Sequence, residues 1–273
     1  MKDLRQARSY ADYIGKIGWD VDEYKGVFLY INKLLFWKFV KVQRPFSIDF
    51  ISLSHYIENK YRFSRVYIEP STNLQYRKLL DIGFRYYNSP FLPSKTIQID
   101  LARKEEQLLK EMHKKTRYNI KIALRNKLNV STTHDIEKFA DFWQKCASDW
   151  GMFFRQKDKI KAIYNSFGSN SLVHTVTDKK GNWLAAILRI SAFNISYYLY
   201  AASSKEGNKL FAPTLATWAA IKSAKDEGKK IFDFEGIYDE RFPLNSWKGF
   251  SRFKMGFGGR IVTYPGCLSK VIF

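Results

Sequence analysis

One lysine near the C-terminal end of the sequence has neighbours that suit chemistry. Lys254 lies between Phe253 and Phe257, and three glycines follow within five residues. An ammonium in a partly apolar pocket binds a phosphate or a developing oxyanion strongly, because a compact charge acts there with little competition from water. A surface lysine whose stem lies along apolar side chains would have the same neighbours. The sequence therefore indicates Lys254 as a candidate catalytic residue, with an exposed surface position as the alternative.

A short strand and a loop must position this lysine. Residues 231–234 form an apolar run between Gly228 and Gly236, which predicts a buried strand. The following segment, 238–248, is polar and contains Pro243. We expect it to run over the surface at the C-terminal end of the strand, where ligands bind in open α/β sheets.

Cysteine and histidine spacings predict no metal or redox site. Cys146 and Cys267 are far apart, and the four histidines lack metal-ligand spacing. Cys146 continues an apolar helical stripe that predicts a core position and not a nucleophile; the stripe consists of Phe139, Phe142, Trp143 and Trp150. We expect no cofactor beyond a co-substrate.

The charge of the chain points to phosphate-bearing partners. The 273 residues carry a formal net charge of +20, spread along the sequence. Nucleic acid, a nucleotide-linked substrate or an anionic membrane surface would suit this charge, and a generally basic proteome is the alternative. The N-terminus lacks an apolar signal core, and lysines interrupt the most apolar window, 27–42. We expect a soluble cytoplasmic protein, with contact at the inner face of the membrane left open.

The most basic segment, 104–127, is predicted to be one amphipathic helix. Its apolar face consists of Leu109, Met112, Thr116, Ile120 and Ala123, and its cations are Lys110, Lys114, Lys115, Arg117, Lys121 and Arg125. The acidic first turn and basic later turns also suit the helix dipole. The helix is therefore either a polyphosphate-binding surface or a solvated face.

The order of expected elements predicts an α+β fold. Three strands at 172–177, 183–191 and 195–201 read as a meander, and a helix over 213–227 leads into the strand at 231. The first third also gives helices, a meander of strands, then helix and strand. This order is acetyltransferase-like (GNAT-like) and occurs twice, in tandem. We expect an N-terminal domain over 1–93, completed by 260–273, and a C-terminal domain over 94–259 that carries most of the substrate site.

Several of these segments resemble the FemABX family of nonribosomal peptidyl transferases. The C-terminal signature of the family is similar to Asp233, Gly236, Ile237, Phe253, Lys254, Phe257 and Gly258. The basic segment 115–121, the strand 199–203 and the pair Ala212-Pro213 also match the family's pattern. The likeness covers roughly 95–266 well and the first third weakly.

The resemblance implies a site and a reaction. Carried over by position, the substrate-site residues would be Arg155, Tyr200 and Lys254, with Lys16 placed only by Trp19. Lys254 would be the catalytic residue, and the basic segment adds Arg117 and Lys121 as substrate-binding candidates. Arg155 as a solvated helix-start residue and Tyr200 as a core aromatic are the structural alternatives. Two departures concern the substrates: Lys159 stands where some relatives have tyrosine, and Glu69 where similar sequences have aspartate before proline.

Family members transfer an aminoacyl group from aminoacyl-tRNA to the peptide amine of a peptidoglycan precursor, so these are the implied partners. The alternatives are an acyl-CoA N-acyltransferase on a GNAT-like fold and a non-enzymatic basic RNA-binding module. Against the first, 203–208 is a poor substitute for a glycine-rich pyrophosphate cradle. The sequence leaves open which amino acid is moved, whether the acceptor is UDP-linked or lipid-linked, the oligomeric state, and how tRNA is bound without the long helical arm of larger members.

Overall fold

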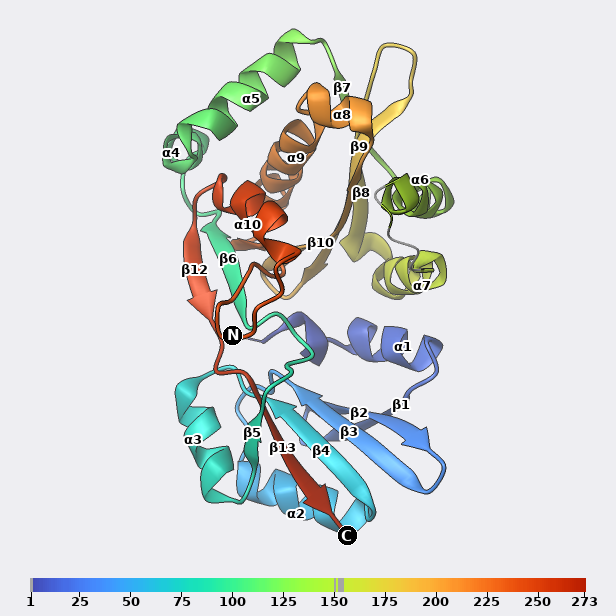
Figure 1. Ribbon diagram of the computed structural model, residues 1–273, viewed down its shortest axis with the longest axis vertical. Coiled ribbons are helices and arrows are strands. Elements are labelled where there is room, and N and C mark those ends of the chain that lie inside the picture. The colour runs from blue at the N-terminus through green and yellow to red at the C-terminus, as the bar shows by residue number, and fades with distance from the viewer. Residues whose placement is uncertain (1, 150, 152–154) are drawn as a thin grey trace. The chain divides into compact units, whose positions relative to one another are not determined.

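The computed structural model describes residues 2–149, 151 and 155–273 (Figure 1). The chain forms two compact units, each assembled from separate stretches of sequence. Unit 1 contains residues 1–95, 238–245 and 262–273, and unit 2 contains residues 96–237 and 246–261. The chain therefore passes between the units four times.

Unit 1 is built on a six-stranded sheet with the order β1-β2-β3-β4-β13-β5. The strands are β1 (Asp20–Tyr24), β2 (Val27–Leu34), β3 (Trp37–Gln43), β4 (Ser64–Glu69), β5 (Arg85–Tyr87) and β13 (Cys267–Ile272). β1, β2 and β3 form the antiparallel meander expected from their alternating pattern, and β3 pairs with β4 in parallel. β13 lies inside the sheet, antiparallel to both β4 and β5.

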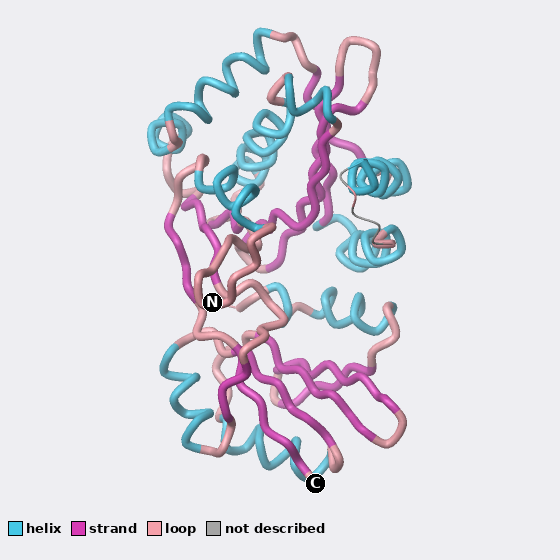
Figure 2. Tube along the Cα trace, in the orientation of Figure 1, coloured by secondary structure: helices cyan, strands magenta, loops and turns pink. Residues whose placement is uncertain are grey.

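Helices cover both faces of this sheet (Figure 2). α2 (Phe50–Lys60) begins where the Asp49 carboxylate accepts backbone N–H groups, and α3 (Asn73–Asp81) begins at Thr72 in the same way. Leu53, Ile57 and Leu79 of these two helices are buried against one sheet face. A short 3₁₀ turn (Leu4–Gln6) and α1 (Arg8–Lys16) pack on β1 and β2.

Unit 2 is built on a seven-stranded sheet with the order β12-β6-β11-β10-β9-β8-β7. The strands are β6 (Lys95–Asp100), β7 (Asn129–Thr133), β8 (Ser171–Thr177), β9 (Trp183–Ala192), β10 (Ile195–Ser203), β11 (Ile231–Asp233) and β12 (Arg260–Thr263). β8, β9 and β10 are the predicted antiparallel meander. β11 joins β10 in parallel and β6 antiparallel, so the short apolar run at 231 is a central strand.

Two groups of helices enclose the sheet of unit 2 (Figure 1). α6 (Ile136–Asp149) and α7 (Lys157–Phe167) cover one face, with a 3₁₀ turn (Gly168–Asn170) after α7. α9 (Ala212–Asp226) packs on the other face, and α5 (Lys114–Arg125) packs on α9 as an outer layer. The remaining helices are α4 (Glu105–Glu111), α8 (Lys205–Lys209) and α10 (Trp247–Met255).

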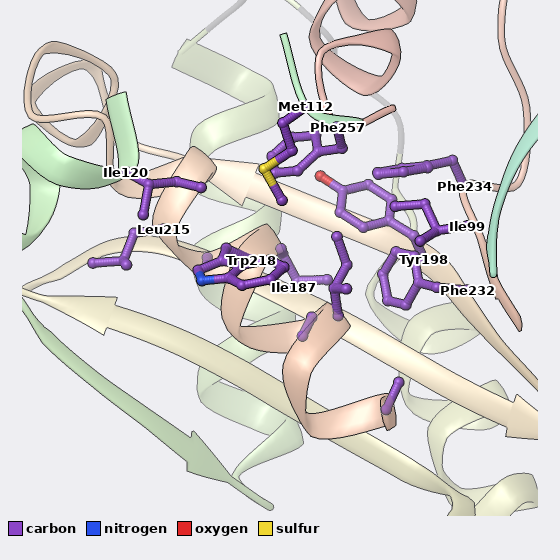
Figure 3. Packing of buried hydrophobic residues seen from close by; sticks show 14 of the residues in the cluster. Ile99, Met112, Ile120, Ile187, Tyr198, Leu215, Trp218, Phe232, Phe234 and Phe257 are labelled. Carbon is purple, nitrogen blue, oxygen red and sulfur yellow. The ribbon is translucent and has the colours of Figure 1, made fainter. Parts of the chain in front are cut away.

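The core of unit 2 lies between the sheet and α9 (Figure 3). Phe232, Phe234 and Tyr198 come from the central strands or follow them directly, and Phe257 and Trp218 come from the helical side. Phe234 contacts both Tyr198 and Phe257, with ring centroids 5.5 and 5.7 Å apart. The segment after β11 and the segment after α10 are therefore fixed by one aromatic cluster.

The predicted single helix over 104–127 is wrong, because two helices meet there at an angle. Met112 and His113 adopt extended conformations between α4 and α5. The His113 N–H donates to the Gly256 carbonyl at 2.9 Å, so the backbone after α10 supplies a partner to an amide at the break. The α+β class is confirmed.

Candidate functional site

The site candidate begins where β10 loses one of its neighbours. β11 ends at Asp233 and pairs only with residues 195–197 of β10, while β10 continues to Ser203. The register with β9 shifts between Tyr198 and Tyr200, which is the signature of a β-bulge. Within the described chain, the last two thirds of β10, residues 198–203, are thus paired on the β9 side alone. A bulge and a missing neighbour open the sheet at this point.

A cavity of about 340 Å³ lies at this opening. Its walls come from β9, β10, α6 and the residues around α8–α10, and they are mostly apolar. Polar groups are few: Ser203 and Asn208, whose side chains are hydrogen-bonded to each other at 2.9 Å, lie at one side. An apolar pocket with a small number of placed polar groups is the usual form of a small-molecule site.

The buried carboxylate of Asp233 organises the loop that follows β11. It accepts hydrogen bonds from the Thr96 hydroxyl at 2.7 Å, the Gln98 amide at 2.8 Å and the Glu235 N–H at 2.8 Å. Burial raises the pKa of Asp233, and the nearby Glu235 carboxylate acts in the same direction. With all these bonds internal to the fold, Asp233 is a positioning residue for the turn.

That turn directs two carbonyl groups towards one place. Glu235 adopts a left-handed conformation with φ +55°, and Gly236 follows with φ +123°, a conformation that favours glycine. The Lys254 ammonium donates to the carbonyls of Phe234 and Gly236, both at 2.7 Å. The two sequence motifs that stand about twenty residues apart are therefore joined through Lys254.

Lys254 is a buried cation with an altered proton affinity. It is 8% exposed, and its Nζ lies 4.9 Å from the ring centroid of Phe250 and 5.5 Å from that of Tyr198. Burial lowers the pKa of Lys254 to about 8, while the Glu235 and Asp233 carboxylates act to raise it. Tyr198 and the adjacent Phe253 line the cavity, so the ammonium lies behind its aromatic wall.

The glycines after Lys254 allow close backbone packing. A Cβ on Gly258 would lie 2.8 Å from the Glu111 carbonyl, and one on Gly259 would lie 2.6 Å from the Gln98 carbonyl. Both residues also have positive φ. These glycines hold the end of α10 against α4 and β6 and thereby fix the helix that carries Lys254.

The predicted binding residues fall in different places. Tyr200 lies on β10 and packs edge-on against Trp143 of α6, with ring centroids 5.9 Å apart. Arg155 is exposed just before α7 and lines a separate hollow with Gln144 and Ser148 of α6. Lys16 is exposed in the last turn of α1, in unit 1.

The two predicted residues of α5 differ from each other. The Arg117 guanidinium bonds to the carbonyls of Met112 and Lys110 and so completes the C-terminal end of α4. The side chain of Lys121 is exposed. Both residues line a groove against α9, apart from the cavity at β10.

Sequence reasoning missed three wall residues of the cavity: Tyr198, Phe253 as a lining residue, and Trp143. Trp143 is part of the stripe assigned to the core, and it lines the cavity next to the register shift in β10, where its ring packs on Tyr200. Cys146 of the same stripe is buried, and burial raises the pKa of its thiol to about 11, which leaves it protonated. Trp150 of the stripe lies outside the described residues. No group of potential metal ligands occurs in the described part of the chain.

Comparison with known proteins gives one family match over part of the sequence and similar solved structures over nearly the whole chain. Residues 173–272 match the FemAB family. The crystal structure of FemX is similar with a TM-score of 0.85 at 16% identity, over 99% of this chain and 92% of that chain. No curated protein sequence matches.

Two further structures are similar at lower scores. The C-terminal domain of a putative lysylphosphatidylglycerol synthetase from Agrobacterium fabrum gives a TM-score of 0.62 at 14% identity, over 97% of this chain and 88% of that chain. A tandem GNAT protein from the clavulanic acid biosynthesis pathway gives 0.51 at 8% identity, over 93% and 83%.

These findings confirm the predicted fold of two GNAT-like domains, and they bear out the resemblance of the C-terminal part of the chain to the FemAB family. No helix within 2–149, 151 and 155–273 has the length and apolar character needed to cross a membrane.

Proposed function

We propose that this protein transfers an aminoacyl group from aminoacyl-tRNA to an amine of a peptidoglycan precursor, in keeping with the match of residues 173–272 to the FemAB family. The observation that carries this proposal is the Lys254 ammonium, held by two carbonyls behind the cavity at the open end of β10. The product would be a precursor extended by one residue for an interpeptide bridge.

The proposed reaction needs alignment and charge stabilisation more than a nucleophile on the protein. The acceptor amine attacks the ester carbonyl of the donor, and a tetrahedral oxyanion forms. The C–N bond replaces the ester C–O bond, and the proton lost by the amine goes to the departing ribose oxygen. A fixed cation close to the oxyanion stabilises the transition state more than the ground state.

Lys254 has one donor left for this role. An ammonium has three N–H groups, and two of them are bonded to the Phe234 and Gly236 carbonyls. The carbonyl pair fixes the position of the charge before the substrate arrives, so little reorganisation is needed during reaction. Burial of the ammonium strengthens its interaction with a negative charge.

The turn after β10 favours a tRNA-borne donor over coenzyme A. A pyrophosphate cradle needs free backbone N–H groups. Here the Ser204 N–H is bonded to the Leu184 carbonyl at 3.0 Å, and the Gly207 N–H to the Ser204 hydroxyl at 2.9 Å. A Cβ on Gly207 would lie 2.0 Å from the Leu184 carbonyl, so the turn is pressed against β9 and leaves no room for a phosphate on that side.

Binding roles for the other predicted residues are part of the proposal. Arg155 carries an exposed planar fork suited to the diphosphate of a UDP-linked or lipid-linked precursor. Tyr200 packs against Trp143, and its hydroxyl would orient either substrate. Lys16 and Lys121 would contribute charge, and Arg117 would act through the α4–α5 junction. The reaction would take place in the cytoplasm, at the inner membrane face for a lipid-linked acceptor.

A transfer assay with defined acceptors tests the proposal. The protein is incubated with mixed aminoacyl-tRNAs and either a UDP-linked or a lipid-linked muropeptide, and the acceptor is analysed by mass spectrometry. We expect a mass increase of one aminoacyl residue that depends on the acceptor amine. Phosphatidylglycerol vesicles serve as a third acceptor, because aminoacylation of lipid alone would contradict the peptidoglycan assignment. RNA binding without transfer to any acceptor would favour the non-enzymatic reading.

A further inference from the structure

A second cavity lies on the other side of α10 from the ammonium of Lys254. It has a volume of about 520 Å³ and is enclosed by the start of α5 and by α10. Lys115 and Asn119 from α5, Arg252 from α10, and His113 between α4 and α5 provide its polar groups. Phe253 lines both this cavity and the cavity at β10.

Four further side chains lie along the exposed face of α5, the helix whose first turn lines this cavity. Lys114, Tyr118, Lys121 and Arg125 follow each other at intervals of four, three and four residues, which places them on one side of the helix. All four are exposed, and Tyr118 retains 59% of its accessible surface. The stripe spans about 16 Å along the helix axis. We call these four residues the α5 face.

The charges of the α5 face are uncompensated, in contrast to neighbouring cations. Arg103 is paired with Glu111, and Lys222 with Glu105. Among the described residues, no ion pair involves the three cations of the α5 face, and residues 114–125 contain no carboxylate. Arg117 is turned inwards to the carbonyls of α4, so it does not share in this surface.

We infer that the α5 face and the cavity at Arg252 together bind the phosphate backbone of an RNA strand, and that this surface holds the acceptor arm of the donor. The inference rests on the proposed function for the identity of the RNA. Regularly spaced cations with one exposed aromatic ring suit a single strand, because phosphates meet the cations and a base stacks on the ring. Phe253 then lies between the bound strand and the cavity where the aminoacyl end would react.

The test is a titration with a fluorescent RNA hairpin that ends in a single-stranded 3′ tail. The variant combines Lys114→Gln, Lys121→Gln and Arg125→Gln, because glutamine keeps helix propensity while the charge is lost. Its matched control combines Lys179→Gln, Lys180→Gln and Lys230→Gln, three exposed cations elsewhere in unit 2 with the same loss of charge. Circular dichroism melts establish that all variants fold.

We expect the α5-face variant to lose roughly tenfold or more in RNA affinity at about 0.1 M salt, and the slope of log affinity against log salt to become shallower by about two to three. The control should retain nearly the parental slope. Arg252→Gln should reduce the slope by about one. Tyr118→Ala should lower affinity several-fold at an unchanged slope, because stacking releases no counterions.

Equal losses in the two triple variants would overturn the inference, since charge alone would then explain binding. A loss confined to anionic phosphatidylglycerol vesicles, with RNA affinity intact, would overturn it in favour of a membrane surface. The titration needs no catalysis, so it separates the two proposals. If RNA binding depends on the α5 face but no aminoacyl transfer occurs, the proposed function is wrong and this inference stands. If transfer occurs but the RNA affinity is the same with and without the α5-face cations, this inference is wrong and the proposed function stands.

Discussion

Replacing Lys254 by methionine separates the charge of this residue from its packing. The methionine keeps most of the aliphatic stem between Phe250 and Tyr198 and removes the ammonium. The change deletes two hydrogen bonds to carbonyls and the proposed contact with the oxyanion. Stability and catalysis should therefore respond by different amounts.

The stability change is a difference between two opposing effects. The lowering of the pKa from 10.5 to about 8 corresponds to about 3 kcal/mol of unfavourable charge burial, which the substitution relieves. The two carbonyls lose their donor, and each buried unsatisfied group costs about 1–3 kcal/mol. We expect the free energy of unfolding to fall by about 0–3 kcal/mol, so that Lys254→Met stays folded at 25 °C.

The loss of transition-state stabilisation in Lys254→Met should be larger than its loss of folding stability. Removal of one preorganised oxyanion donor costs about 3–4 kcal/mol, or roughly 100–1000-fold in rate. Lys254→Arg should restore only part of this rate, because a planar fork cannot occupy the position of a compact ammonium between two carbonyls. Lys230→Met is the control, an exposed lysine that precedes β11.

Single-turnover transfer from preloaded aminoacyl-tRNA gives the deciding rates, with chemical denaturation of each variant in parallel. If Lys254→Met transfers at the parental rate while its melt remains cooperative, the assignment of Lys254 to the reaction is wrong. A variant that fails to fold is replaced by Lys254→Gln, whose amide can still donate to the carbonyls but carries no charge.

Three further outcomes follow from the same structure. Transfer should decline as the pH rises through about 8, because the Lys254 ammonium loses its proton there. Between pH 8 and 10.5 the unfolded chain still holds that proton, so the free energy of unfolding of the parent should rise with pH. Denaturant melts of Lys254→Met should lack this rise. Truncation after Gly266 removes β13 from between β4 and β5, and we expect protease-sensitive protein; an unchanged melting temperature would contradict this. Gly258→Ala should cost about 1–3 kcal/mol, since φ is +79° and the Glu111 carbonyl is 2.8 Å from the new Cβ, whereas Gly249→Ala, with open space around it, should gain roughly 0.5–1 kcal/mol in thermal melts.

The local periodicities in the sequence were sufficient for most strands and for α9. Alternating or continuous apolar runs predicted β8, β9, β10 and the short β11. A strand buried on one face has an apolar side chain at every second residue, and a strand buried on both faces is apolar throughout. The two helices within 104–127 could not be separated, since the break at His113 depends on a hydrogen bond to Gly256, more than 140 residues away. α10 was missed because the aromatic and glycine pattern there serves packing between distant segments.

The site was predictable in its residues more than in its geometry. The sequence indicated Lys254, but not that two carbonyls hold it, because backbone direction at Glu235 and Gly236 depends on the Asp233 network. The sequence did not distinguish Arg117 from Lys121, because both are cations of one basic segment. In the fold Arg117 is bonded to carbonyls of α4, whereas Lys121 is exposed. The roles of Lys254, Arg155, Tyr200 and Lys16, and the domain division at 93/94, stay predictions.

The interior position of β13 has a consequence for synthesis of the protein. Strands β4 and β5 are made within the first third of the chain, yet the strand that fills the gap between them is residues 267–272. During translation the edges of β4 and β5 that face this gap stay unpaired until all of unit 2 has been made. Unpaired strand edges are prone to associate with other chains. A chain that stops a few residues before β13 leaves the gap between β4 and β5 open. The sheet of unit 1 can therefore close only after residues 267–272 have been made.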